Sequence, residues 1–392
     1  MTQTHSEPTT TSHRTARHDA SSEKIVRELF ASAGVTIDGT APGDIQVKHN
    51  GFYGRLLREA SIGLGESYMD EWWECDALDV FIEKILRVDM KKKIQGSLRL
   101  KLLTIQSLVT NMQSRARAKI VAEKHYDLGN DLYEVMLDPR MVYTCGYWKN
   151  AKTLDEAQDA KLELICKKAD LKPGMRVLDL GCGFGGFALY AAEKHGCKVT
   201  GVTVSVEQQK LAMDRARAKK LDVDIRVADY RTANEKFDAV VSIGMMEHVG
   251  WKNHRAMMEV VHRCLKLEGR AVVHTIAANE SQTHGIPFFE KHIFPNAASP
   301  SLAQLGKAME GLFVLEDLHN IGPDYRPTLL AWWKNFEAGY ATLDQKKYDR
   351  RFWRMWRFYL LAAAGAVAAR ESQLFHLVLT HVGQPQPDCR FS

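Results

Sequence analysis

Glycines and acids in the middle of the chain offer the first candidate for a binding site. The segment LDLGCGFGG, residues 178–186, places a turn of glycines between a strand-like run and a helix-like run. Such a turn lets the backbone approach a nucleoside, and the spacing of Gly181, Gly183 and Gly186 also fits a nicotinamide dinucleotide site. A glycine-tightened turn that binds nothing is the structural alternative.

The residues around this loop favour S-adenosylmethionine over a dinucleotide. Asp179 directly precedes the loop, where its carboxylate can approach a methionine ammonium group. Asp229 follows the third predicted strand, where it can accept a hydrogen bond from an adenine amino group. A dinucleotide enzyme needs an acid for the ribose at the end of the second strand, and here that strand ends in GVTVS with Thr203.

Polar side chains farther along the chain are candidates for acid–base chemistry. Glu247 follows the fourth predicted strand and His274 lies in the fifth, and open α/β sheets bind ligands at the carboxyl ends of their strands. Each has a structural alternative, because a histidine within AVVHTI is often a core residue and a glutamate can cap a helix. Cys145 has no evident base in its sequence neighbourhood, so we interpret it as a small buried side chain rather than a nucleophile. Tyr325, in GPDYRP, can equally make a structural hydrogen bond.

An alternation of strands and helices is needed to position these residues. From about residue 171 the pattern predicts that alternation, which is typical of an α/β domain. The predicted strands cover residues 176–180, 198–204, 224–228, 237–243 and 270–276, and the predicted helices cover 186–195 and 207–220.

The length of 392 residues predicts two domains. We expect a disordered polar tail over 1–22, an N-terminal lipid-binding or dimerisation domain over 23–90 and a catalytic domain over 123–392. Helices are predicted near 23–33 and 76–86. The stretch 91–122 carries eight basic residues, no acid and an apolar stripe, so it is either an amphipathic helix at a lipid surface or a linker packed on the catalytic domain.

Composition narrows the functional classes. The net charge of +5 permits contact with anionic surfaces without requiring nucleic acid. The seven cysteines include no C-x-x-C pair, so neither a disulfide framework nor a metal site is indicated. The longest apolar run, residues 358–369, is too short to span a bilayer. We expect a cytoplasmic protein that associates peripherally with the inner face of the membrane.

Seven stretches in order along the chain resemble the cyclopropane-fatty-acyl-phospholipid synthase family and the related mycolic-acid methyltransferases. The resemblance runs from about residue 23 to near the C-terminus, with Phe184 where the family often has Trp and Gly146 where Ala is common. It implies a Rossmann-like class I S-adenosylmethionine-dependent methyltransferase domain, preceded by a smaller, mostly helical domain. The stretches are GESYMDEWWECD, EKHYDLGNDLYEVMLDPRMVYTCGYW, LDLGCGFGG, GVTVSVEQQ, IGMMEHVG, HTIAANES and HNIGPDY.

The resemblance implies methylene transfer from S-adenosylmethionine to the cis double bond of unsaturated acyl chains in membrane phospholipids. The alkene attacks the sulfonium methyl, and the resulting carbocation loses a proton from the new methyl as the ring closes. The family's base is a bound bicarbonate ion, which implies roles for Cys145, Glu247, His274, the backbone of Ile276, and Tyr325. A related C-methyltransferase that acts on unsaturated lipids without ring closure is the alternative.

The resemblance also implies the cofactor contacts and the assembly. Besides Asp179, they map to Tyr143, Thr144, Gly181, Gly183, Thr203, Gln208 and the stretch 229–231, where Tyr230 would lie near the adenine. The stretch 126–131 would form a lid over the cofactor, or simply a helix-capping turn. The enzyme would be a homodimer.

Three other interpretations are weighed against this one. A small-molecule carbon or nitrogen methyltransferase would not need the extra N-terminal domain and the basic segment. A nicotinamide oxidoreductase would need an acid in place of Thr203, and an inert membrane-binding module would not need Asp179, Glu247 and His274 together. The stretch 350–360, RRFWRMWRFYL, could line an acyl tunnel with its arginines at the mouth, or be a core helix with a solvated basic face.

Overall fold

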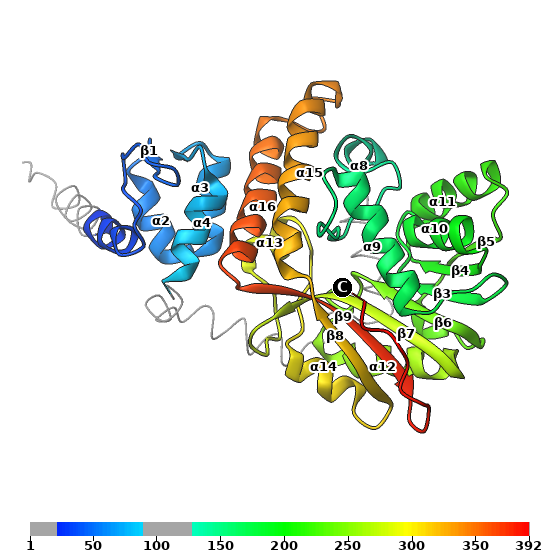
Figure 1. Ribbon diagram of the computed structural model, residues 1–392. Coiled ribbons are helices and arrows are strands. Elements are labelled where there is room, and N and C mark those ends of the chain that lie inside the picture. The colour runs from blue at the N-terminus through cyan, green and yellow to red at the C-terminus, as the bar shows by residue number, and fades with distance from the viewer. Residues whose placement is uncertain (1–21, 89–127, 392) are drawn as a thin grey trace, which may run out of the picture.

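A seven-stranded mixed sheet forms the centre of the molecule (Figure 1). The computed structural model describes residues 22–88 and 128–391. The strand order is β5-β4-β3-β6-β7-β9-β8, in which the first five strands run parallel and β9 lies antiparallel to both β7 and β8. The strands are β3 (Arg176–Leu180), β4 (Lys198–Thr203), β5 (Val223–Val227), β6 (Phe237–Ile243), β7 (Leu265–Ala278), β8 (Phe313–Asn320) and β9 (Ser372–His381).

Helices cover both faces of the sheet, as the alternating pattern predicts. Val177 in β3 joins the apolar layer shared with α9, α10 and α11, whereas the next residue, Leu178, joins the layer shared with α12 and α14. Side-chain caps define several helix starts, including a capping box at Thr153 before α9. These helices are α9 (Leu154–Lys168), α10 (Gly186–His195), α11 (Val206–Ala218), α12 (His254–Cys264) and α14 (Leu302–Met309).

A second group of helices stands beside one end of the sheet. The long antiparallel pair α15 and α16 rises from it, with α8 on one side and α13 on the other (Figure 1). Their bounds are α8 (Asn130–Met136), α13 (Pro287–His292), α15 (Tyr325–Gly339) and α16 (Arg350–Ala368). Within the described residues, no helix is long and apolar enough to cross a membrane.

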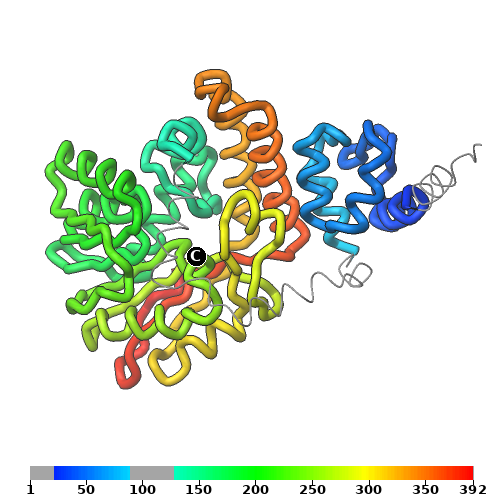
Figure 2. The backbone as a smooth tube through the Cα atoms, turned by 180° about the vertical axis from the view of Figure 1, so that it is seen from behind, coloured from blue at the N-terminus to red at the C-terminus, as the bar shows by residue number. Residues whose placement is uncertain are grey.

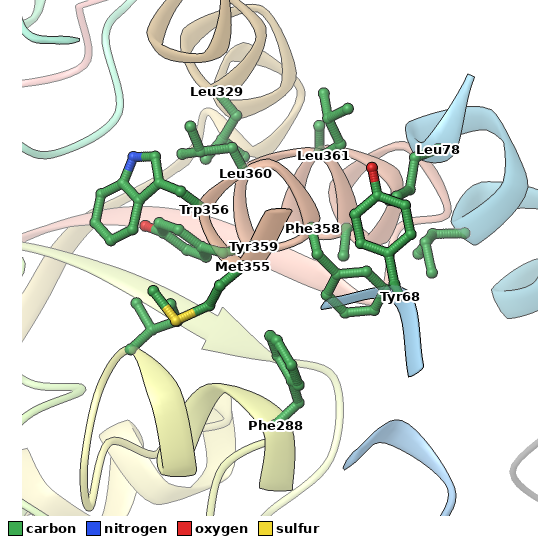
Figure 3. Packing of buried hydrophobic residues seen from close by; sticks show 14 of the residues in the cluster. Tyr68, Leu78, Phe288, Leu329, Met355, Trp356, Phe358, Tyr359, Leu360 and Leu361 are labelled. Atoms are coloured by element: carbon green, nitrogen blue, oxygen red, sulfur yellow. The ribbon is translucent and has the colours of Figure 1, made fainter. Parts of the chain in front are cut away.

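The N-terminal module, residues 22–88, packs against α16 on the side away from the sheet (Figure 2). Residues 22–31 are helical, and α2 (Gly51–Glu59), α3 (Ser61–Met69), α4 (Leu78–Arg87) and the short pair β1 (Gln46–Val47) and β2 (Trp73–Glu74) follow. One continuous apolar core joins it to the rest, and Tyr68 and Leu78 lie beside Phe358 and Leu361 of α16 (Figure 3).

Arginines of α16 hold this module in place. Arg354, only 1% exposed, donates to Glu74 at 2.7 Å and to the Trp73 carbonyl at 3.1 Å, and its guanidinium lies 4.0 Å from the ring centre of Tyr68. Arg357 donates to the carbonyls of Cys75 and Asp76. The prediction that these arginines meet a phosphate at a tunnel mouth therefore has no support. Nor is Arg354 part of a solvated face.

Ion pairs and hydrogen bonds also join the module to α13. Glu66 accepts hydrogen bonds from Arg55 at 2.6 Å within the module and from His292 of α13, with a nitrogen–oxygen distance of 3.0 Å, and it contacts Lys291 as well. The neighbouring Gly65 lies against the ring of Phe288, so closely that a Cβ atom would come within 2.3 Å of it. The module therefore fixes the position of a helix that borders the central cavity.

Candidate active site

A cavity of about 560 Å³ lies between the carboxyl ends of the central strands and the helices α13, α15 and α16. One end is polar and is built by the glycine loop and the strand ends. The other end is apolar and extends along α16 to Leu86 of the N-terminal module. Eleven residues predicted for the site line this cavity: Tyr143, Thr144, Cys145, Asp179, Gly181, Gly183, Gln208, Glu247, His274, Ile276 and Tyr325.

The glycine loop forms the polar wall because its backbone adopts conformations that favour glycine. Gly181 and Gly183 have φ angles of +78° and +53°. A Cβ atom on Gly181 would come within 2.8 Å of the Met245 sulfur, whereas one on Gly183 would project into open space. Gly183 therefore keeps a volume free in which a ligand can approach the backbone.

A buried carboxylate and a buried lysine face this polar end together. Asp179 is 1% exposed, and among the described residues its Oδ2 has no hydrogen-bond partner. Burial raises the pKa of Asp179 to about 7. Lys161 of α9, fully buried, donates to the Thr144 hydroxyl at 2.8 Å, and burial lowers its pKa to about 8. Both groups are poised to gain charge when a ligand of opposite charge binds.

Thr203 contributes to the site through Gln208. Its hydroxyl donates to Gln208 Oε1 at 2.9 Å, and Gln208 lines the cavity at the first turn of α11. Thr203 itself is not among the described residues that line the cavity. The structure therefore assigns Thr203 a supporting position.

Asp229 and Tyr230 lie away from the cavity. The Asp229 carboxylate caps a short 3₁₀ turn and accepts hydrogen bonds from Arg231, at 2.8 Å from Nε and 2.6 Å from Nη2. Tyr230 is buried in the apolar layer beneath α12. Neither belongs to the described lining of the cavity, and their predicted contacts with the adenine stay a prediction.

Glu247 is held beside the end of β7. Its Oε1 accepts from the Ile276 backbone N–H at 2.8 Å, and its Oε2 accepts from the Thr275 hydroxyl at 3.0 Å. The side chain is almost fully buried, and burial raises its pKa to about 7 despite these bonds. Near neutral pH the carboxyl is therefore present in both its neutral and its charged form. It bonds to β7 and does not cap the next helix.

His274 lies in β7 with one ring nitrogen bonded inside the protein. Nδ1 of His274 is 2.8 Å from Nε2 of His376 in β9. No described residue provides a partner for the buried Nε2 of His274. Burial lowers the pKa of His274 well below its usual value, so the ring is neutral. A neutral imidazole on the cavity wall with one free nitrogen is suited to bind a small polar ligand.

Cys145 and Tyr325 complete the polar end. Burial raises the pKa of the Cys145 thiol far above its ordinary value, which disfavours the thiolate form. Its sulfur lies 4.0 Å from the Thr328 hydroxyl. Tyr325 begins α15, and burial holds its pKa well above the usual value, so its hydroxyl stays protonated.

An aromatic patch forms another part of the cavity wall. Phe289 and Phe294, from and just after α13, face Tyr359 of α16 at ring-centre distances of 5.7 and 5.5 Å. The hydroxyls of Tyr143 and Tyr359 lie 2.8 Å apart. Such a lining excludes water and suits a hydrocarbon chain. The stretch 350–360 thus reaches the cavity through its aromatic face, not its arginines.

Two residues at or behind the cavity wall were not predicted from the sequence: Lys161 and His376. Lys161 sits in AQDAKLEL, where a lysine ordinarily faces solvent. His376 sits in a run of apolar residues, as His274 does, which was the one available signal. Of the predicted lid, 126–131, residues 126 and 127 lie outside the described residues, and Asn130 and Asp131 begin α8.

In sequence, the chain is similar to cyclopropane synthases. The family model described as mycolic acid cyclopropane synthetase matches residues 113–377. A cyclopropane-fatty-acyl-phospholipid synthase of Escherichia coli strain K12 is 48% identical over 357 residues, which cover 91% of this chain and 93% of that protein.

Two solved structures share the architecture of the catalytic part. A cyclopropane synthase from Mycobacterium tuberculosis superposes with a TM-score of 0.62 at 26% identity, over 69% of this chain and 99% of the other. A mycolic acid cyclopropane synthase in complex with SAH and CTAB gives a TM-score of 0.61 at 27% identity, over 67% and 97% of the two chains. The predicted α/β methyltransferase fold is confirmed.

Proposed function

The chain belongs to the mycolic acid cyclopropane synthetase family, and from this premise we propose that it converts the cis double bond of unsaturated acyl chains in membrane phospholipids to a cyclopropane ring. The observation that carries the proposal is the cavity itself. Its polar end holds a carboxylate whose Oδ2 has no hydrogen-bond partner among the described residues, and another part of its wall is formed by aromatic and aliphatic side chains. A charged nucleoside and a hydrocarbon chain can therefore meet inside one cavity.

S-adenosylmethionine fits the polar end. When bound, it supplies an electrophilic methyl group, and the solved relative with SAH supports a cofactor of this class. The Asp179 carboxylate would accept hydrogen bonds from the ammonium group of the cofactor's methionine part, and Lys161 would neutralise the carboxylate of the same part. The space beside Gly183 would admit the nucleoside. Ion pairing with the cofactor would then offset the free-energy cost of removing both groups from water, which accounts for their burial at this position.

A bicarbonate ion fits the wall formed by β7. Glu247, His274, Cys145, Tyr325 and the Ile276 backbone surround the polar end where β6 and β7 finish. The protonated Tyr325 hydroxyl and the neutral His274 ring can donate to an anion, and the protonated form of Glu247 can do the same. Such an ion supplies the base that removes a proton from the transferred methyl so that the ring closes.

Replacement of Glu247 and His274 tests this assignment. Glu247→Gln and His274→Gln keep the approximate volume, so we expect folded proteins that bind S-adenosylmethionine with normal affinity by calorimetry. Turnover should fall about 100-fold or more, because acid–base groups typically contribute that much. Bicarbonate should stimulate the depleted wild-type protein. Near-normal turnover in both variants would place the base elsewhere.

Membrane association and dimerisation complete the proposal. The acyl substrate lies in a bilayer, so the protein must reach the membrane surface as a peripheral protein on the cytoplasmic side. The basic stretch 91–122, which lies outside the described residues, has the charge to contact anionic lipid. Sedimentation with anionic vesicles that persists unchanged after Lys91, Lys92 and Lys93 are all changed to Gln would contradict that role, and a monomeric sedimentation coefficient would contradict the homodimer.

A further inference from the structure

Three histidines lie side by side across the sheet behind the cavity. In the strand register His274 of β7 faces His376 of β9, and His376 faces His319 of β8. His376 is completely buried, and it is not among the described residues that line the cavity. It reaches the site only through His274, whose Nδ1 lies 2.8 Å from its Nε2.

Both rings of the pair are neutral. Burial lowers the pKa of His376 well below its usual value, and the nearby His274, Lys168, His319 and Lys161 oppose a further positive charge. A neutral imidazole carries one N–H, so a single proton lies between Nδ1 of His274 and Nε2 of His376. The ring that owns this proton determines what His274 presents to the cavity.

The two arrangements differ in how many N–H groups find an acceptor. If His274 owns the shared proton, its Nε2 presents a lone pair to the cavity. The His376 N–H is then at Nδ1, a buried atom for which no described residue is a partner. If His376 owns the proton, it donates to His274, and His274 Nε2–H is free to donate to a ligand. Only the second arrangement leaves no buried N–H unsatisfied once an anion occupies the site.

We propose that His376 is a positioning residue that donates its Nε2–H to His274 and thereby makes His274 a hydrogen-bond donor toward an anion in the cavity. This inference rests on the proposed bicarbonate site. The polarity is the reverse of a carboxylate–histidine pair, in which the carboxylate accepts the imidazole proton and leaves the other nitrogen as a base. An imidazole partner instead leaves a neutral donor on the cavity wall, and the partner itself adds no negative charge that would repel the anion.

The test compares two changes at His376 with a control on the same strand. His376→Gln retains an N–H that can donate to His274, whereas His376→Leu does not. His381→Gln is the control, because His381 is buried in β9 but contacts the Leu265 carbonyl, not His274. In the full chain, we expect His376→Leu to raise the bicarbonate concentration for half-maximal activity about 10-fold or more, the lower range for partners that orient a liganding histidine. The affinity for S-adenosylmethionine should change little, and His376→Gln should recover most of the loss.

Nitrogen NMR of ring-labelled histidine gives a readout that does not depend on turnover. In the wild type with bicarbonate, we expect the His274 signals to show a protonated Nε2 and an unprotonated Nδ1, and in His376→Leu a mixture of tautomers. A protonated Nδ1 in the wild type would overturn the proposal, as would equal losses in His376→Leu and His376→Gln. If wild-type activity does not respond to bicarbonate, the proposed base is wrong, and the tautomer measurement still decides the role of His376.

Discussion

At the residue scale, the polar end of the cavity is built from groups whose charge depends on what occupies it. Asp179 and Glu247 have pKa values raised to about 7 and Lys161 has one lowered to about 8, in each case mainly by burial. For each of these groups, the hydrogen bonds and charges of the described residues do not fully offset the loss of hydration. Burying these groups without a partner of opposite charge is unfavourable, and binding of an oppositely charged ligand relieves this free-energy penalty and so contributes to affinity.

This cost should be measurable for Asp179 as a pH dependence of folding. Because its folded pKa is raised above the unfolded value, its contribution to stability is fully present below pH 4 and is lost as pH rises toward about 7. Asp179→Asn removes that titration. We expect the free energy of unfolding of the variant, relative to wild type, to improve by on the order of 3 kcal/mol between pH 4 and pH 8.

Urea denaturation of the protein without cofactor, at both pH values, measures this difference. Asp238→Asn is a suitable control, because Asp238 has a pKa lowered by hydrogen bonds from Lys266 and the Arg176 backbone, although its burial opposes them. Its contribution is present above about pH 4 and is lost only at lower pH, so Asp238→Asn should show no comparable change between pH 4 and pH 8. A parallel pH dependence in wild type and Asp179→Asn would show that Asp179 is not desolvated as the structure indicates.

At the element scale, the junction of β3 and α10 determines where the cofactor can bind. Gly183 has φ at +53° and its missing side chain would project into the cavity. Gly174 is a matched position, since it has φ at +82°, open space around it and no place in the described cavity lining. A side chain at either glycine strains the backbone, but only at Gly183 does it also occupy ligand space.

We therefore expect Gly183→Val to abolish detectable S-adenosylmethionine binding by calorimetry, whereas Gly174→Val retains it. Both variants should lose stability, by about 1 kcal/mol or more, because a branched side chain is unfavourable at positive φ. Thermal unfolding checks the second expectation. Binding by Gly183→Val with unchanged affinity would remove the glycine loop from the cofactor site.

Much of this element scale is predictable from the sequence, for identifiable reasons. Strands β3 and β6 match their predicted bounds, and β4 and β5 differ by a residue at their ends, because each is a short segment in which apolar residues are continuous or alternate with polar ones, bounded by turn residues. Strands β8 and β9 were not predicted. The apolar run of β9 cannot be distinguished by periodicity from a buried helix, and β8 has acids and a histidine within it.

The site residues were likewise predictable only where a local sequence pattern places them. Residues at the ends of parallel strands, such as Asp179 and Glu247, gather as sheet topology requires. Asp229 also follows a strand, and its carboxylate accepts hydrogen bonds from the backbone N–H and the guanidinium of Arg231, a local contact that the strand pattern does not reveal. Lys161 and His376 were missed because their importance comes from tertiary packing of α9 and β9, which no local pattern reveals.

At the scale of the whole molecule, the N-terminal module is part of the active-site architecture. Leu86 reaches the cavity wall, and Gly65 packs on Phe288 of α13 while Glu66 binds the same helix. The module thus supports the helix that borders the acyl end of the cavity. A disturbance at this contact should affect catalysis more than an equal disturbance inside the module.

Two glycines of α3 allow that comparison. At Gly65 a Cβ atom would come within 2.3 Å of Phe288, whereas at Gly63 it would come within 2.5 Å of the Arg55 carbonyl, inside the module. We expect Gly65→Ala and Gly63→Ala to lose comparable stability, about 1–3 kcal/mol. Only Gly65→Ala should also lower kcat at a temperature where both are folded. Equal kcat values in the two variants would show that the module does not support α13.

The product of this enzyme should contain a cyclopropane ring, and counting the deuterium atoms in the product can establish whether it does. The measurement is mass spectrometry of a monounsaturated phospholipid after incubation with the full chain and S-adenosylmethionine whose methyl group carries three deuterium atoms. Ring closure requires loss of one of them to the base, so the product should gain a carbon with two deuterium atoms and should survive ozone treatment. A product that retains all three and is cleaved by ozone would identify a C-methyltransferase without ring closure, and would contradict the account.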